Sequence, residues 1–120
     1  MEIKLHTEFT FDSAHKLLMY DGICNQIHGH TWLCELWFKG DERYKDNVGI
    51  LVDFGIVKSI KKDLDHKYLN DFFVSNPTAE NISKFIYNGL RIAINTNIKI
   101  KVRLYETAVD KKTWCELGDW

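Results

Sequence analysis

The alternation of apolar and polar residues near the N-terminus predicts an extended strand. Over residues 3–13 the apolar side chains recur on one face, with polar residues mostly between them. The apolar members of this series are Ile3, Leu5, Phe9 and Phe11. Residues 30–39 are rich in aromatic residues and apolar on both faces, which is also typical of a strand.

Two segments in the middle of the chain show apolar residues at helical spacing. The first is predicted to begin at Asp53, whose side chain can cap the helix. Its apolar positions are Phe54, Val57, Ile60 and Leu64. The second is predicted to begin at Pro77 and Thr78, with Thr78 as the cap. Its apolar stripe consists of Ile82, Phe85, Ile86, Gly89, Leu90, Ala93 and Ile94.

Strict alternation returns over residues 98–106 and predicts a third strand. One face carries Ile98, Ile100, Val102 and Leu104, and the other carries Lys99, Lys101, Arg103 and Tyr105. A shorter strand is predicted at about residues 112–117. The order β-β-α-α-β-β predicts an α+β fold, with an antiparallel sheet and two helices on one face.

Length and composition narrow the class of protein further. The 120 residues suit one domain spanning residues 1–120. The formal net charge is −1, with no block of like charges, which argues against a nucleic-acid or membrane surface. The N-terminus lacks the apolar run of a signal peptide, and no segment reaches the roughly 18 apolar residues of a membrane span. We therefore expect a cytoplasmic protein.

Three histidines have the spacing of a metal site. His28 and His30 are two residues apart on extended backbone, so both side chains leave the same face. If the first two strands form a hairpin, His15 at the end of the first strand reaches the same point. Three neutral nitrogen ligands and one open position are the pattern of catalytic zinc. The alternative is that these histidines are ordinary polar surface residues.

The cysteines do not form a disulfide framework, because three of them cannot all pair within one chain. Cys24 lies four residues before His28. It can be a fourth zinc ligand, a buried thiol, or a reactive thiol whose pKa is lowered by a nearby cation. Cys34 and Cys115 lie in strand-like segments and are interpreted as core residues.

Four further residues are candidates for proton transfer, ligand binding or helix capping. Asp65 and His66 follow the first helix and can form part of a proton relay, although a histidine at a helix C-terminus is also favoured by the macrodipole. Glu106 continues the inward series of its strand, so its carboxylate needs a partner such as a ligand with paired N–H donors. The alternative is a carboxylate that emerges at the strand end. Glu80 lies in the first turn of the second helix, where a capping role is favoured.

Six motifs, in this order, resemble those of the 6-pyruvoyltetrahydropterin synthase superfamily and cover nearly the whole chain. They are FTFDSAHKL, CNQIHGHTW, LVDF, LDHKYLND, NPTAEN and VRLYET. The resemblance implies the tunnelling fold of that superfamily, whose element order matches the one predicted above. Trp32 is a departure, since the family more often has a smaller or tyrosine-like residue after HGHT.

The resemblance also implies roles for individual residues. His15, His28 and His30 correspond to the zinc ligands. Cys24, Asp65 and His66 correspond to the catalytic residues. Glu106 corresponds to the acid that holds the pterin ring, and Thr78 and Glu80 match a stretch that lines the same pocket.

Three residues separate Cys24 from His28, as in the bacterial 6-carboxytetrahydropterin synthases of queuosine biosynthesis. This resemblance implies a zinc-dependent lyase that converts 7,8-dihydroneopterin triphosphate to 6-carboxytetrahydropterin, acetaldehyde and triphosphate. The alternatives are the pyruvoyl-forming enzyme of the same family and, more distantly, a structural zinc module closed by Cys24.

The resemblance further implies a homo-oligomer, a hexamer built from two trimers, with Glu106 in a pocket where subunits meet. The physical motive is that a small sheet leaves its edges exposed, and joining several sheets into a closed barrel removes those edges.

Overall fold

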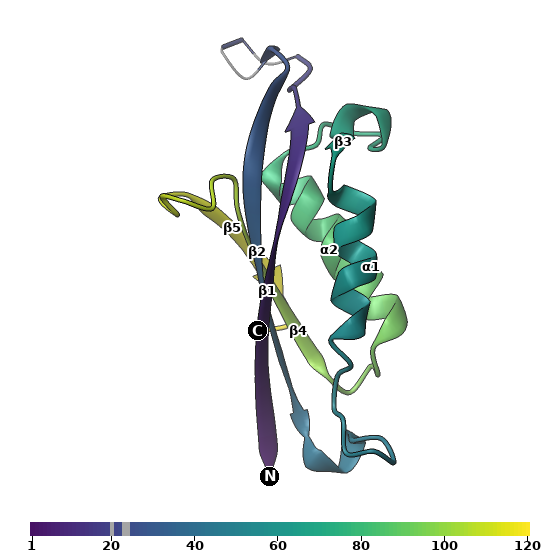
Figure 1. The fold of residues 1–120 in the computed structure, drawn as a ribbon. Coiled ribbons are helices and arrows are strands. Elements are labelled where there is room, and N and C mark those ends of the chain that lie inside the picture. The colour runs from purple at the N-terminus through teal and green to yellow at the C-terminus, as the bar shows by residue number, and fades with distance from the viewer. Residues whose placement is uncertain (20, 23–24) are drawn as a thin grey trace.

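The computed structural model describes residues 1–19, 21–22 and 25–120 as one layer of sheet and one layer of helices. The elements are β1 (Glu2–His15), β2 (His28–Asp41), the 3₁₀ helix η2 (Glu42–Tyr44), α1 (Gly55–Leu64), β3 (Lys67–Tyr68), the 3₁₀ helix η3 (Leu69–Asp71), α2 (Ala79–Ala93), β4 (Lys99–Tyr105) and β5 (Trp114–Gly118). Both α-helices lie on one face of the sheet, and the β1–β2 hairpin extends beyond them at both ends (Figure 1). The predicted α+β class is confirmed.

The five strands lie in the order β3-β1-β2-β4-β5. All neighbouring strands are antiparallel except β1 and β3, which pair in parallel through Ser13–Lys67 and Ala14–Tyr68. The sheet is therefore mixed, and the prediction of a wholly antiparallel sheet is wrong at this edge. A strand of two residues is too short to show an alternation in the sequence.

The structure confirms the predicted N-cap of α2 but places the N-cap of α1 one residue later than predicted. Thr78 is the N-cap of α2, and its hydroxyl accepts a hydrogen bond from the Asn81 amide at 3.1 Å, as predicted. Asp53 acts one position before the cap of α1. Its carboxylate accepts from the Gly55 amide at 2.8 Å, while Phe54 occupies the cap position.

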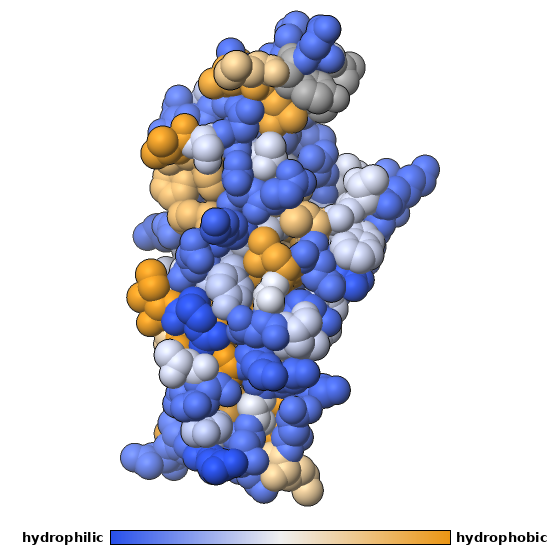
Figure 2. Space-filling view, turned by 180° about the vertical axis from the view of Figure 1, so that it is seen from behind, coloured by the Kyte–Doolittle hydropathy of each residue, from blue (hydrophilic) through white to orange (hydrophobic). Residues whose placement is uncertain are grey.

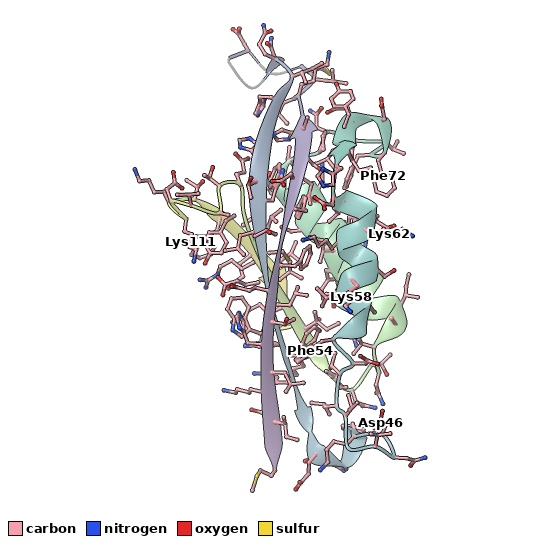
Figure 3. The ribbon with its side chains drawn as sticks, in the orientation of Figure 1. Asp46, Phe54, Lys58, Lys62, Phe72 and Lys111 are labelled. Atoms are coloured by element: carbon pink, nitrogen blue, oxygen red, sulfur yellow. The ribbon has the colours of Figure 1, made fainter. Side chains whose placement is uncertain are left out.

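The core lies between the helices and the inward face of the sheet. It contains Phe9 and Phe11 of β1 and the predicted inward series of β4, together with one face of β2 and one face of each helix. Of the other predicted inward residues of β1, Leu5 packs at the margin of the core and Ile3 lies outside it. In α2 the buried stripe is narrower than predicted, because Gly89 and Ala93 are exposed on its flank. Lys58 and Lys62 of α1 point away from the sheet, and Lys111 projects from the loop between β4 and β5 (Figure 3).

The helix-free face of the sheet carries charged and aromatic side chains instead of an apolar layer. The ring centroid of Trp37 lies 5.0 Å from Lys101 Nζ and 5.3 Å from Arg103 Cζ. His6 Nε2 and Glu35 Oε2 are 3.0 Å apart on the same face. Seen from behind, the molecule is mostly polar, with apolar side chains scattered over it (Figure 2). Among the described residues, no helix has both the length and the apolar character needed to cross a membrane.

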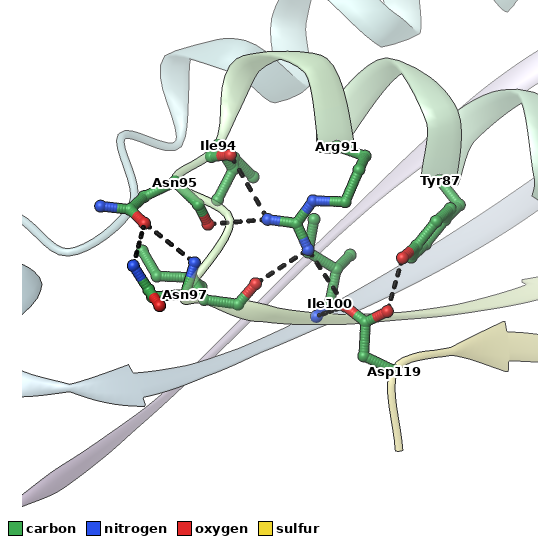
Figure 4. Close-up of polar contacts among 8 residues, drawn as sticks. Tyr87, Arg91, Ile94, Asn95, Asn97, Ile100 and Asp119 are labelled. Atoms are coloured by element: carbon green, nitrogen blue, oxygen red, sulfur yellow. Dashed lines mark hydrogen bonds and ion pairs between the residues drawn. The ribbon is translucent and has the colours of Figure 1, made fainter.

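The end of the chain is held against α2 and β4 by Asp119 (Figure 4). Its carboxylate accepts hydrogen bonds from the Tyr87 hydroxyl, from Arg91 Nη1 at 3.1 Å and from the Ile100 amide at 2.8 Å. The Arg91 guanidinium also donates to the backbone carbonyls of Ile94, Asn95 and Ile98. These contacts hold β5 in place along β4.

Replacing Asp119 with asparagine should lower the free energy of unfolding by about 2 kcal/mol, because charge-assisted hydrogen bonds are lost. Burial acts to raise the pKa of Asp119, but hydrogen bonds from Tyr87 and Ile100 and the charge of Arg91 lower it overall. A carboxyl with a lowered folded pKa stabilises the protein above its ordinary value of 3.8, and this stability is lost as pH falls through the folded pKa.

Denaturant unfolding of wild type and Asp119→Asn should therefore show a difference that shrinks as the pH falls below about 4. A difference that stays constant with pH would show that the ionised carboxylate contributes nothing.

Candidate metal and substrate site

The register of β1 and β2 brings three histidines to one end of the core face. His15 pairs directly with His28, and Ser13 pairs with His30. Residues opposite each other in an antiparallel pair share a face, and so do residues two apart on one strand. The same face continues toward the core as the Phe11–Trp32 pair. The hairpin expected from the sequence is thus formed, and it places all three imidazoles together.

Hydrogen bonds to backbone carbonyls orient two of the three rings. His15 Nδ1 lies 2.7 Å from the carbonyl oxygen of Pro77, and His28 Nδ1 lies 2.8 Å from that of Gln26. Donation from Nδ1 leaves the lone pair on Nε2. The Nε2 atoms of His15 and His30 are buried without a hydrogen-bond partner among the described residues. A buried polar atom without a partner requires an explanation, and a metal ion bound by both nitrogens would supply one.

The three histidines fit a metal ion by distance and by charge. Each ring offers a nitrogen that lies within 4.8 Å of those of the other two. Burial lowers the pKa of His15 and His30, although Pro77 and Glu106 act in the opposite direction. Neutral imidazoles are the form that binds metal, and three of them are a common donor set for catalytic zinc.

Glu106 lies directly after β4 and beside this cluster. Its Oε2 is 3.8 Å from His30 Nε2, and its side chain is 41% exposed. Glu106 lines a pocket together with the fully buried Leu104, and its partial exposure just beyond the strand also fits a carboxylate that emerges at the strand end. The pocket is lined by Ala79, Glu80, Leu104, Glu106, Thr113, Trp114 and Cys115.

Thr78 and Glu80 lie at the N-terminus of α2, on the other side of this pocket. Glu80 is part of the pocket wall and also lies in the first turn of the helix, where the macrodipole favours an acidic residue. The hydroxyl of Thr78 is occupied as the helix cap, and Thr78 itself is not among the lining residues.

Asp65 and His66 lie at the β3 edge of β1. Asp65 accepts a hydrogen bond from the Asp12 amide at 2.8 Å, which is the main cause of its lowered pKa. Its Oδ2 lies 3.5 Å from His66 Nε2, and the His66 side chain is 81% exposed. His66 has a positive φ of 56°, and its amide donates to the Asp12 carbonyl at 2.7 Å. The predicted pair is therefore formed, with its imidazole facing outward.

The structure confirms the predicted core position of Cys34 but not that of Cys115. Cys24 lies outside the described residues. Cys34 is fully buried, and burial raises the pKa of its thiol strongly, as expected of a core residue. Cys115 was expected in the core but is only half-buried, because it lies on the pocket wall. Neither the pocket residues Thr113 and Trp114 nor the carbonyls behind the histidines were predicted, since no sequence motif marks them.

Comparisons with known proteins identify relatives over nearly the whole chain. Residues 4–117 match the family described as 6-pyruvoyl tetrahydropterin synthase. A 6-carboxy-5,6,7,8-tetrahydropterin synthase of Synechocystis sp. is 34% identical over 98 residues, covering 74% of this chain and 75% of that protein. The protein of the same name from Haemophilus influenzae is 32% identical and covers 94% of this chain and 96% of its own length.

The fold is also shared with solved structures. The 6-pyruvoyl tetrahydropterin synthase of Caenorhabditis elegans superimposes with a TM-score of 0.77 at 21% identity. The match covers 100% of this chain and 97% of that one.

Proposed function

The chain belongs to the 6-pyruvoyl tetrahydropterin synthase family, and we propose that it is a zinc-dependent lyase acting on 7,8-dihydroneopterin triphosphate. The proposed products are 6-carboxy-5,6,7,8-tetrahydropterin, acetaldehyde and triphosphate, as a step in queuosine biosynthesis. The observation that carries this proposal is the pair of buried Nε2 atoms of His15 and His30, which have no hydrogen-bond partner among the described residues. They lie beside His28 and next to a pocket that contains Glu106. The names of the two curated relatives support the carboxy-forming reaction.

His15, His28 and His30 would hold the zinc through their Nε2 atoms. Bound zinc would supply Lewis-acid chemistry, making the side-chain hydroxyls of the substrate more acidic. The carbonyls of Pro77 and Gln26 fix the tautomers of His15 and His28, so these rings present a lone pair without rearrangement.

Glu106 would bind the pterin ring. An ionised carboxylate accepts two parallel hydrogen bonds, which matches the amino group and neighbouring ring N–H of a pterin. Because Glu106 Oε2 is only 3.8 Å from His30 Nε2, a ring held there places its side chain against the histidine cluster. Glu80 contributes a second carboxylate to the wall of the same pocket.

Proton transfer is assigned to Cys24 and to the Asp65–His66 pair, following the family resemblance. Cys24 as thiolate would remove a proton from one side of the substrate chain. His66 would exchange a proton on the other side. The lowered pKa of Asp65, caused mainly by the Asp12 amide, keeps its carboxylate ionised next to the His66 ring. An ionised partner orients an imidazole and stabilises its protonated form.

The active site is proposed to be complete only in a homo-oligomer, a hexamer of two trimers. Within one chain Glu106 and the histidine cluster lie together, whereas His66 lies at the opposite side of β1 with its ring exposed. We therefore assign His66 to the site of a neighbouring subunit. Closing the sheets of several copies into a barrel would also cover the free edges at β3 and β5.

Product analysis tests the proposed reaction. Zinc-loaded protein supplied with 7,8-dihydroneopterin triphosphate should release acetaldehyde and yield 6-carboxytetrahydropterin, identified by mass. A pyruvoyl product without acetaldehyde would assign the chain to the other activity of its family. Bound zinc without any turnover would favour the structural zinc module.

A further inference from the structure

We infer that Trp32 is a positioning residue of the histidine cluster: its indole holds the rings of His15 and His30 in the orientation that makes their Nε2 atoms converge. The inference rests on the proposed metal site. It concerns a residue that has no ligand atom of its own and departs from the family pattern.

Trp32 is packed directly against two of the three imidazoles. Its ring centroid lies 5.1 Å from that of His15 and 5.1 Å from that of His30, at interplanar angles of 79° and 73°. These are edge-to-face contacts, which are the favoured geometry of aromatic pairs. The indole is fully buried, so the contacts are not shared with water.

The indole is itself fixed by contacts on other sides. It stacks on Phe11 at 5.7 Å with an interplanar angle of 4°, and its Nε1 donates to the Ser13 carbonyl at 3.3 Å. Ser13 is the residue that pairs with His30, and its hydroxyl donates to the Leu64 carbonyl. The indole of β2 is therefore hydrogen-bonded to β1 beside the histidines, at a point where β1 also contacts the end of α1.

His30 depends most on this contact. His15 and His28 are each oriented by a hydrogen bond from Nδ1 to a carbonyl, but no hydrogen bond of His30 is found within the described residues. The terminal torsion of a histidine is broad, so a ring without such a bond needs packing to hold it. Trp32 provides this packing, and it also excludes water from one side of the cluster.

The test is the zinc affinity of Trp32→Phe, measured by competition with a chromophoric chelator on folded apoprotein. A smaller ring without the N–H should leave His30 free to rotate, and affinity should fall about 10- to 100-fold, the usual scale for outer-shell changes. The cobalt(II)-loaded variant should also show shifted visible absorption bands, because the orientation of two ligand rings changes.

Two control variants distinguish a change in the orientation of the imidazole rings from a general loss of protein stability. Trp37→Phe removes an indole from the opposite face of the same strand and should leave zinc affinity and the cobalt spectrum unchanged. Phe38→Leu loosens the core on the same face of β2, six residues away from Trp32, so it should lower stability but leave the cobalt spectrum unchanged.

The inference is overturned if folded Trp32→Phe binds zinc as tightly as wild type. It is equally overturned if Phe38→Leu weakens zinc binding and shifts the cobalt bands to the same extent. If wild type itself bound no zinc, the proposed metal site would fail, which is a different result from either of these.

Discussion

Replacing any one of His15, His28 and His30 with alanine should remove most of the bound zinc and abolish turnover. Two remaining imidazoles leave the ion with too few protein ligands, and structural and catalytic zinc sites use at least three. Metal content of the purified variants, measured against protein concentration, checks the first part, and product formation checks the second.

His6→Ala is the matched control. His6 lies on β1 like His15 but on the helix-free face, paired with Glu35. Its loss should leave bound zinc unchanged. Zinc retained in full by His15→Ala or His30→Ala would show that the cluster is not the metal site.

The same measurements on Cys24→Ala decide the role of this cysteine. We expect zinc to remain while turnover falls by about 10²-fold or more, the usual scale for a lost acid–base group. If Cys24→Ala loses zinc as completely as the histidine variants do, Cys24 is a ligand and its catalytic assignment is wrong.

Oligomers that combine two inactive variants should recover activity when the lost residues come from different subunits. Co-expressed His66→Ala and Glu106→Ala chains should restore about a quarter of wild-type activity at equal, random mixing in a closed ring. Half of the sites keep Glu106, and half of those face a neighbour that keeps His66. Each variant alone should be inactive.

His30→Ala combined with Glu106→Ala provides the contrast. Both residues lie in one chain, with His30 Nε2 and Glu106 Oε2 3.8 Å apart, so no mixed site regains both. Recovery in this pair, or full activity of a monomer in sedimentation, would contradict the proposed assembly.

Much of the fold follows from local patterns. Alternation predicted the core faces of β1 and β4, and Thr78 predicted the start of α2, because burial and capping act within a few residues. The parallel pairing of β3 with Ser13–Ala14 has no such local cause. It depends on where α1 ends against β1, which is a tertiary effect.

Local patterns likewise predict some features of the candidate site, whereas others depend on how the strands pair. The common face of His28 and His30 could be predicted from strand periodicity alone, whereas periodicity left two alternatives open for Glu106. The pocket wall formed by Trp114 and Cys115 could not, because it depends on the pairing of β5 with β4. Trp32 has no metal-binding atom, and no motif marks it as part of the site. Its contact with two imidazoles is set by the cross-strand register.

X-ray absorption at the zinc edge tests the central claim most directly, on wild-type protein loaded with one zinc per chain. We expect three nitrogen ligands at about 2.0–2.1 Å and an oxygen in the remaining position, with no sulfur scatterer. A sulfur ligand at about 2.3 Å would show that Cys24 closes the tetrahedron and would contradict a catalytic zinc held by His15, His28 and His30.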